Sequence, residues 1–203
     1  MSVREAIRVL EALGLVEVRT GAERGATLRR EASNAFADIL RFRLALGHLT
    51  AETVLDFRLV LQVWAAGRSA ERRDEAVLRS VRDLVRRMET EPLGPNEYQS
   101  VDVEFHLLIG RGAQNELATL VFEAIRHSLE HTVLDTFLRE ADWRSLRERL
   151  TTEHRAILAA IETGKVETSK RLIEDHIRGF WHREPAAAGT AGRYRENPPQ
   201  ARR

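Results

Sequence analysis

The chain has 203 residues, enough for one sizeable domain or for a small domain joined to a larger one. An apolar fraction of 43% and a charged fraction of 31% are typical of a soluble globular protein, and no stretch is apolar enough for a membrane span or a secretion signal, so we expect a cytoplasmic protein with no membrane partner. The net charge of +1 does not by itself indicate nucleic acid, and the absence of cysteine excludes disulfides, thiolate chemistry and cysteine-bound zinc.

The N-terminus predicts a helix followed by a β-hairpin. Ser2 and Glu5 have the spacing of a capping box, apolar residues recur at helical spacing, and Gly14 ends the run. Residues 15–19 and 26–30 then alternate apolar and polar side chains around two glycines, which is typical of a hairpin. A helix that leads into a glycine-tipped hairpin is the back half of a winged helix-turn-helix, in which the helix enters the major groove and the wing touches backbone or minor groove.

The N-terminal segment contains six arginines. Arg4 and Arg8 share one helix face, and four more arginines lie in the hairpin, but four glutamates reduce the net charge of the segment to +2. The charge pattern leaves two interpretations open, a DNA-contacting surface and an ordinary solvated one. On the first interpretation Ser2, Arg4 and Arg8 contact DNA from the helix, and Arg24 contacts it from the wing.

From residue 33 onward the pattern predicts only helices. We therefore expect a mostly α fold, in which a partial winged helix-turn-helix (recognition helix plus β-hairpin wing, residues 1–32) precedes an all-α antiparallel bundle of about seven helices (residues 33–182). Residues 183–203 hold three prolines and two glycines, which predicts a disordered tail. The expected helices span residues 33–46, 50–67, 74–88, a stretch that Ser100 caps, 115–137, 141–161 and 166–181.

Four scattered side chains of the bundle are candidate metal ligands. Asp102 and His106 lie four positions apart and so share one helix face, and His154 and His176 on later helices could complete the site. Imidazole with one carboxylate suits zinc first, with nickel, manganese or iron as alternatives, and does not suit calcium. The other interpretation is that each histidine is an ordinary core or surface residue, because the Asp-x-x-x-His spacing alone is a weak motif.

Other residues of chemical interest have more ordinary interpretations. His127 and His131 form a second pair four positions apart, which we interpret as pocket lining or surface, with metal ligation as a minor alternative. The three tryptophans are interpreted as core or dimer-contact residues: Trp64, Trp143 and Trp181.

The helix and wing, reading Ser-Val-Arg-Glu-Ala-Ile-Arg-Val-Leu-Glu-Ala-Leu-Gly-Leu-Val-Glu-Val-Arg-Thr-Gly and followed by an all-α bundle, resemble the GntR family of bacterial transcription regulators. The bundle, from about Asn34 to Trp181, resembles the FadR-like branch, whose C-terminal ligand domain is called FCD. Three metal-binding patterns of that family recur here, as Asp102 to His106, Glu153 to Ile161 and His176-Ile177. The resemblance therefore implies a divalent metal held by Asp102, His106, His154 and His176.

The resemblance also implies an effector, a small carboxylate metabolite that coordinates the metal through open positions. Arg58 falls where many members place an arginine that faces the ligand, and a guanidinium suits a carboxylate, although Arg58 on an apolar helix could instead extend to the surface. Asn115 matches a family asparagine, and its favoured alternative is a helix N-cap.

The N-terminus departs from the family pattern. Members carry two more helices before the position of Ser2, so we expect either a late start within a longer protein, which we favour, or the loss of part of the DNA-binding module.

Three functions remain in contention at this point. The first is a metabolite-responsive regulator that binds operator DNA as a homodimer and is not an enzyme. The second is a dimeric metal and metabolite sensor that does not bind DNA. The third, and least favoured, is a metal-dependent hydrolase with Glu104 or Glu153 as general base, since no His-Glu-x-x-His signature is present.

Overall fold

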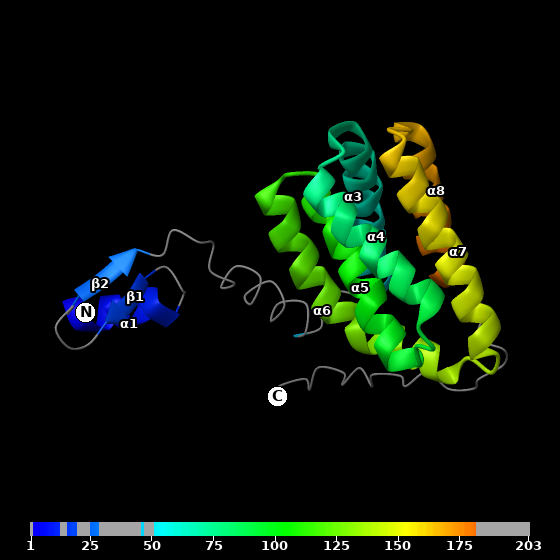
Figure 1. Ribbon diagram of the computed structural model, residues 1–203. Coiled ribbons are helices and arrows are strands. Elements are labelled where there is room, and N and C mark those ends of the chain that lie inside the picture. Colours follow the sequence, from blue (N-terminus) through cyan, green and yellow to red (C-terminus); the bar gives the residue numbers. More distant parts are fainter. Residues whose placement is uncertain (1, 13–15, 20–24, 29–45, 47–50, 182–203) are drawn as a thin grey trace, which may run out of the picture.

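The computed structural model describes residues 2–12, 16–19, 25–28, 46 and 51–181, without the side chains of residues 51 and 127–132. A helix and a two-stranded hairpin come first, and six long helices follow (Figure 1). This mostly α arrangement confirms the predicted fold class. The predicted helix at residues 33–46, the tail at residues 183–203 and Arg24 lie outside the described residues. The elements are α1 (Val3–Ala12), β1 (Val16–Arg19), β2 (Gly25–Leu28), α3 (Ala51–Arg72), α4 (Glu75–Thr90), α5 (Pro95–Gly112), α6 (Glu116–Arg139), α7 (Trp143–Glu162) and α8 (Val166–Trp181).

The N-terminal unit, α1 with β1 and β2, has the local structure that the sequence predicts. The backbone N–H of Ser2 donates to Glu5 Oε2 at 2.7 Å, and the Glu5 N–H donates to Ser2 Oγ at 3.3 Å, which completes the capping box. β1 and β2 pair antiparallel, with Val16 opposite Leu28 and Arg19 opposite Gly25. Both predictions for this segment, the capped helix and the hairpin, are confirmed.

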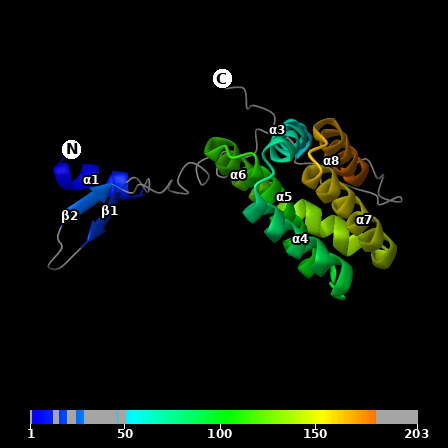
Figure 2. The same cartoon turned by 45° about the horizontal axis from the view of Figure 1, so that its top comes forward.

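Gly67 does not end its helix, so that prediction is wrong. α3 continues to Arg72, and the left-handed backbone of Arg73 (φ 49°) follows it. Gly67 instead lies where α3 and α8 run side by side (Figure 2), because a Cβ added there would come within 2.6 Å of the Lys170 side chain. The glycine therefore serves close helix packing here and not helix termination.

The start of α5 also differs from the prediction. Ser100 does not cap this helix: its hydroxyl donates to the Asn96 carbonyl inside the helix, and α5 begins at Pro95. Proline suits the first helical position because its missing N–H needs no partner there. The Gly94 N–H donates to Glu97 Oε2 at 2.7 Å and so secures the start. The helix thus begins six residues earlier than a cap at Ser100 would place its start.

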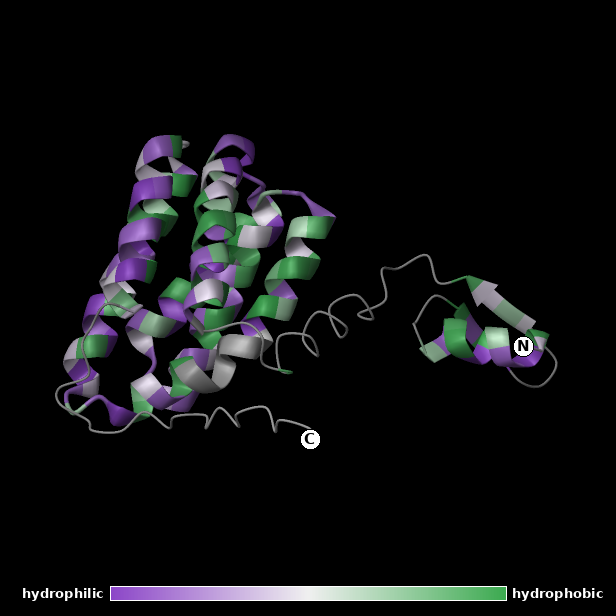
Figure 3. Cartoon of the chain, turned by 180° about the vertical axis from the view of Figure 1, so that it is seen from behind, coloured by the Kyte–Doolittle hydropathy of each residue, from purple (hydrophilic) through white to green (hydrophobic). Residues whose placement is uncertain are grey.

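One hydrophobic core joins all six bundle helices, and polar and apolar stretches alternate along each of them (Figure 3). Tyr98 is completely buried at its centre, with its ring edge-on to Phe137 at 6.0 Å and to Trp143 at 5.5 Å. All three tryptophans are half-buried against core clusters, consistent with a core role. None of the described helices combines the length and apolar character that a membrane crossing requires. The core therefore fixes α5, α7 and α8 against one another, and these helices carry the candidate metal ligands.

Candidate metal centre

The bundle brings the four predicted ligands together. α5 supplies Asp102 and His106, α7 supplies His154, and α8 supplies His176. All four side chains are buried, and one nitrogen or oxygen atom of each lies within 4.8 Å of those of the others. These four residues therefore form one compact group, although Asp102 and His176 are more than seventy positions apart in the sequence. We call this group the Asp/His cluster.

Distances within the Asp/His cluster are short. Asp102 Oδ1 lies 3.1 Å from His154 Nε2 and 3.8 Å from His106 Nε2. The ring centroids of His154 and His176 are 4.5 Å apart, and those of His106 and His176 are 5.3 Å apart. The carboxylate and the three imidazoles therefore surround a common centre.

Contacts behind the rings orient two of the histidines. His176 Nδ1 lies 2.7 Å from Glu153 Oε2, and His154 Nδ1 lies 3.3 Å from the Tyr98 hydroxyl, which also lies 3.2 Å from Thr151 Oγ1. A hydrogen bond at one ring nitrogen fixes the tautomer and leaves the other nitrogen available to a metal. Nε2 of His154 and of His176 is therefore the nitrogen available at the centre of the cluster.

The sequence does not predict the role of these supporting residues. Glu153 begins the family pattern Glu153 to Ile161 and is a candidate general base, whereas its carboxylate accepts from His176 and from Arg149 Nη1 at 2.9 Å. No motif indicates Tyr98. The signal available for Glu153 was its position next to His154, but nothing in the sequence connects Tyr98 with a residue on α7.

Burial controls the protonation of the cluster. Desolvation lowers the pKa of His106 well below its ordinary value and also lowers that of His176, in both cases against the attraction of Asp102. Burial by itself would raise the pKa of Asp102, but the three histidines outweigh this effect and lower it. The cluster therefore favours neutral imidazoles at His106 and His176 beside an ionised carboxylate, which are the ligand forms that metals bind.

The donor set fits a divalent cation. His154 Nε2 is buried and makes no hydrogen bond, although Asp102 Oδ1 lies 3.1 Å away. A cation at the centre would satisfy this nitrogen and would also neutralise the carboxylate. Three nitrogen donors and one oxygen donor suit zinc, nickel, manganese or iron. The Asp/His cluster could thus hold one such ion.

Two adjoining cavities open beside the cluster. Arg58, a half-buried side chain of α3, lines both of them together with Asp102, His106 and Val133. The two spaces measure about 290 and 400 Å³ when the part that is open to solvent is included. Burial lowers the pKa of Arg58, while the negative charge of Asp102 opposes that shift. The guanidinium therefore lies where a ligand anion beside the cluster would meet it.

A model of the FCD domain matches residues 52–179, which is most of the chain. The chain belongs to the FCD family. The HTH-type transcriptional regulator LutR of Bacillus subtilis is 27% identical to this FCD chain over 180 residues, which cover 87% of the chain and 80% of LutR.

Solved structures share the fold. A Streptococcus agalactiae GntR structure has a TM-score of 0.58 at 21% identity and covers 86% of this chain and 77% of its own. Escherichia coli McbR/YncC has a TM-score of 0.50 at 15% identity, covering 87% of this chain and 80% of its own. The FCD match and these similarities support the predicted resemblance to GntR-type regulators of the FadR-like branch.

Asn115 has a structural role in this FCD chain. Its side-chain oxygen accepts from the Ala118 N–H at 2.9 Å and caps α6, as the favoured alternative anticipated. The residue is exposed and does not line either of the two cavities beside the cluster. Its assignment to effector binding stays a prediction without support from these cavities.

The remaining sequence candidates lie elsewhere. Glu104 pairs with Arg111 at 3.4 Å and does not line either cavity. The side chains of His127 and His131 are outside the part of the chain that the structure describes. Metal ligation by His127 and His131 therefore stays a prediction, whereas the four ligands predicted from the family resemblance converge.

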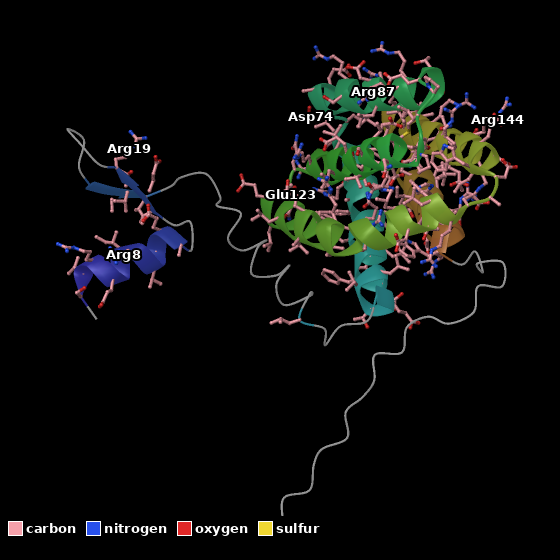
Figure 4. The ribbon with its side chains drawn as sticks, turned by 90° about the horizontal axis from the view of Figure 1, so that it is seen from below. Arg8, Arg19, Asp74, Arg87, Glu123 and Arg144 are labelled. Carbon is pink, nitrogen blue, oxygen red and sulfur yellow. The ribbon has the colours of Figure 1, made fainter. Side chains whose placement is uncertain are left out.

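The candidate DNA-binding residues of α1 are at the surface. Ser2, Arg4 and Arg8 are exposed, and Arg8 projects from α1 while Arg19 projects from β1 (Figure 4). Arg19 lies 3.5 Å from Glu17, so part of its charge is neutralised locally. The exposed arginines are accessible to a polyanion, and their contact with DNA stays a prediction.

Proposed function

We propose that this FCD protein is a metabolite-responsive transcriptional regulator, in which the Asp/His cluster holds a divalent metal and a small carboxylate effector binds beside it. The observation that carries the proposal is the convergence of Asp102, His106, His154 and His176. Three of these residues, Asp102, His106 and His176, line a cavity that Arg58 also lines. In this scheme the protein acts as a cytoplasmic homodimer on operator DNA and not as an enzyme.

The proposed metal supplies positive charge for the effector carboxylate. Four protein donors leave positions open on an ion that accepts six, such as nickel, manganese or iron. Zinc, the first choice by donor type, would have to take more than four ligands to bind the effector. Arg58 lines the same cavity and offers a guanidinium, which suits bidentate pairing with a carboxylate. Aromatic side chains of the first cavity exclude water from this pair and so strengthen it: Phe137, Phe180 and Trp181.

The proposed signal passes through helix packing. The cavity walls come from α3, α5, α6, α7 and α8, so an effector contacts most of the bundle at once. A ligand that binds one packing arrangement better than another shifts the population toward it. In a homodimer such a shift changes the spacing of the two recognition helices on a near-palindromic operator.

Glu153 argues against the hydrolase alternative. A general base needs a free carboxylate next to the attacked water. Both carboxylate oxygens of Glu153 are engaged, one by His176 and the other by Arg149. We therefore assign Glu153 to ligand positioning in the proposed centre.

Metal content tests the centre. Purified protein should retain about one divalent ion per subunit, and Asp102→Asn or His154→Ala should lower that content sharply because each removes a donor. Asp175→Asn is the matched control, since Asp175 is an exposed aspartate next to His176. Elemental analysis after gel filtration gives the readout. If both ligand variants retained about one ion per subunit, the proposed metal centre would be wrong.

DNA binding tests the regulatory part. The protein should prefer its own promoter region to random duplex, and its affinity should fall with added salt. Arg4→Ala and Arg8→Ala should each reduce the salt slope by about one if both residues contact phosphates. Fluorescence anisotropy at several salt concentrations measures both quantities. Effector binding without any promoter preference would instead support a sensor that does not bind DNA.

A further inference from the structure

A second arginine lies beside the proposed effector site. Arg126 of α6 is half-buried, and its Nε is enclosed in the protein without a hydrogen-bond partner. This side chain lines the second cavity, which it shares with Arg58, Asp102 and His106. A buried guanidinium nitrogen without a partner loses its hydration with no compensation, so a ligand acceptor there would be stabilising.

The two cavities, which we call the two lobes, share part of their lining. Arg58, Asp102 and His106 line both of them. The second lobe is also lined by Arg126 and by four apolar side chains: Val103, Leu107, Phe122 and Ile125. A ligand held at the cluster can therefore extend past apolar side chains to Arg126.

The charges around this space call for more than one negative group. Among the described side chains that line the two lobes, the cations are Arg58 and Arg126 and the one carboxylate is Asp102. These three groups leave a net positive charge before any metal is added. A divalent ion would add two further positive charges, which a single carboxylate does not balance. Two arginines from different helices, α3 and α6, indicate two separate anionic groups on the ligand.

We infer that the effector is a small dicarboxylate, with one carboxylate at the Asp/His cluster and Arg58 and the second at Arg126. This inference rests on the proposed function, because it takes the effector to bind beside a metal. It makes Arg126 the residue that distinguishes dicarboxylates from monocarboxylates. The carbon chain between the two carboxylates packs against Val103, Leu107 and Phe122.

Isothermal titration calorimetry of the metal-loaded full chain tests the inference. The probes are acids of matched length: propionate, butyrate and valerate against malonate, succinate and glutarate. Wild-type protein should bind one dicarboxylate at least about tenfold more tightly than its monocarboxylate partner, as an added charged hydrogen-bonded pair predicts. Arg126→Gln should bring that ratio close to one, and Arg126→Lys should retain part of it because the charge remains.

Controls separate a binding role from a structural one. Arg139→Gln changes an exposed arginine at the end of the same helix and should keep the wild-type ratio. Metal content of Arg126→Gln should equal that of Arg139→Gln, since Arg126 is not a ligand. An unchanged ratio in Arg126→Gln, or an equal loss of affinity for both acids, would overturn the inference. Tighter binding of 3-phosphonopropionate than of succinate would also overturn the dicarboxylate assignment.

Different results would contradict the role of Arg126 and the proposed function. Metal-dependent binding of monocarboxylates with no preference for dicarboxylates contradicts the role of Arg126 and leaves the proposed function standing. Absence of binding by every acid in both series, in protein that retains its metal, contradicts the carboxylate effector itself. Binding that is unaffected by removal of the metal with a chelator contradicts the proposed centre.

Discussion

The N-terminal unit and the helical bundle cover their apolar side chains to very different extents. No side chain of α1 is buried, and Val3 and Leu28 remain 78% and 80% exposed. In the bundle, Phe105, Ile157 and Ile173 are completely buried. The apolar pattern alone therefore gives a helix in both regions, whereas tertiary packing gives a core in only one of them.

This difference bears on how the two regions work. A helix of ten residues is marginally stable by itself, so α1 depends on its capping box and on whatever else covers its apolar face. The bundle helices are held by a shared core, which also fixes the rotamers of the Asp/His cluster. The proposed ligand site is thus preorganised by the bundle, whereas the proposed DNA-reading surface is not stabilised in the same way.

The largest expected effect contrasts the two regions directly. Ile173→Ala removes a completely buried side chain of α8 and should lower the free energy of unfolding by about 2 to 5 kcal/mol. Val3→Ala removes an apolar side chain that is 78% exposed and should change it by less than about 0.5 kcal/mol. Urea denaturation followed by circular dichroism measures both values. Similar losses in the two variants would mean that α1 is packed as tightly as the bundle.

The next effect concerns the contacts behind the metal ligands. Glu153→Gln and Tyr98→Phe should each weaken metal affinity by about 10- to 100-fold, because the neighbouring imidazole loses the group that orients it. Glu148→Gln is the matched control, since Glu148 lies on the same helix and pairs with Arg144 at the surface. Competition with a chromogenic chelator gives the affinities. Equal affinities in all three variants would show that core packing alone positions the rings.

Much of this structure could be predicted from local sequence. The capping box at Ser2 and Glu5 and the hairpin after Gly14 depend on neighbours in the chain, and both are confirmed. Asp102 and His106 were placed on one helix face by spacing alone. Their convergence with His154 and His176 required the family resemblance, because spacing does not determine how separate helices pack.

The sequence fails to predict the roles of residues whose important contacts are with distant parts of the chain. Gly67 reads as a helix end, but its lack of a side chain accommodates Lys170 from another helix. Tyr98 carries no motif, yet its hydroxyl reaches His154 across 56 positions of sequence. Arg126 carries no motif either, and the role proposed for it rests on the cavity beside the cluster. These functions depend on the tertiary arrangement of helices that a local pattern does not contain.

A pH titration of the metal-free protein should affect the bundle and not the N-terminal unit, which has no histidine among residues 1–32. Burial lowers the pKa of His106 and His176, so the unfolded chain binds more protons below its histidine pKa of about 6.5. Stability is therefore present above that pH and is lost as the pH falls, by at most about 1.4 kcal/mol per pH unit for each histidine.

Tryptophan fluorescence during urea denaturation at pH 5.5 to 7.5 reports on the bundle alone, because all three tryptophans lie in α3, α7 and α8. The double variant with His106 and His176 both changed to Gln should lose most of the slope. A decline below pH 4 would have another origin, since the pKa values of Asp102 and Glu153 are also lowered. A slope that is unchanged in the double variant contradicts the assignment to these histidines.

The smallest expected effect compares one helix cap in each region. Asn115→Ala removes the cap of α6 and should lower the global free energy of unfolding by about 1 kcal/mol, because α6 is part of the cooperative core. Ser2→Ala removes an equivalent cap from α1, but the loss should appear only as faster amide hydrogen exchange within α1, since α1 buries no side chain. A global loss from Ser2→Ala would show that α1 unfolds together with the bundle, which would make the proposed DNA-reading helix part of the same cooperative unit as the effector site. A loss of effector affinity in Asn115→Ala at unchanged stability would restore this asparagine as a ligand contact.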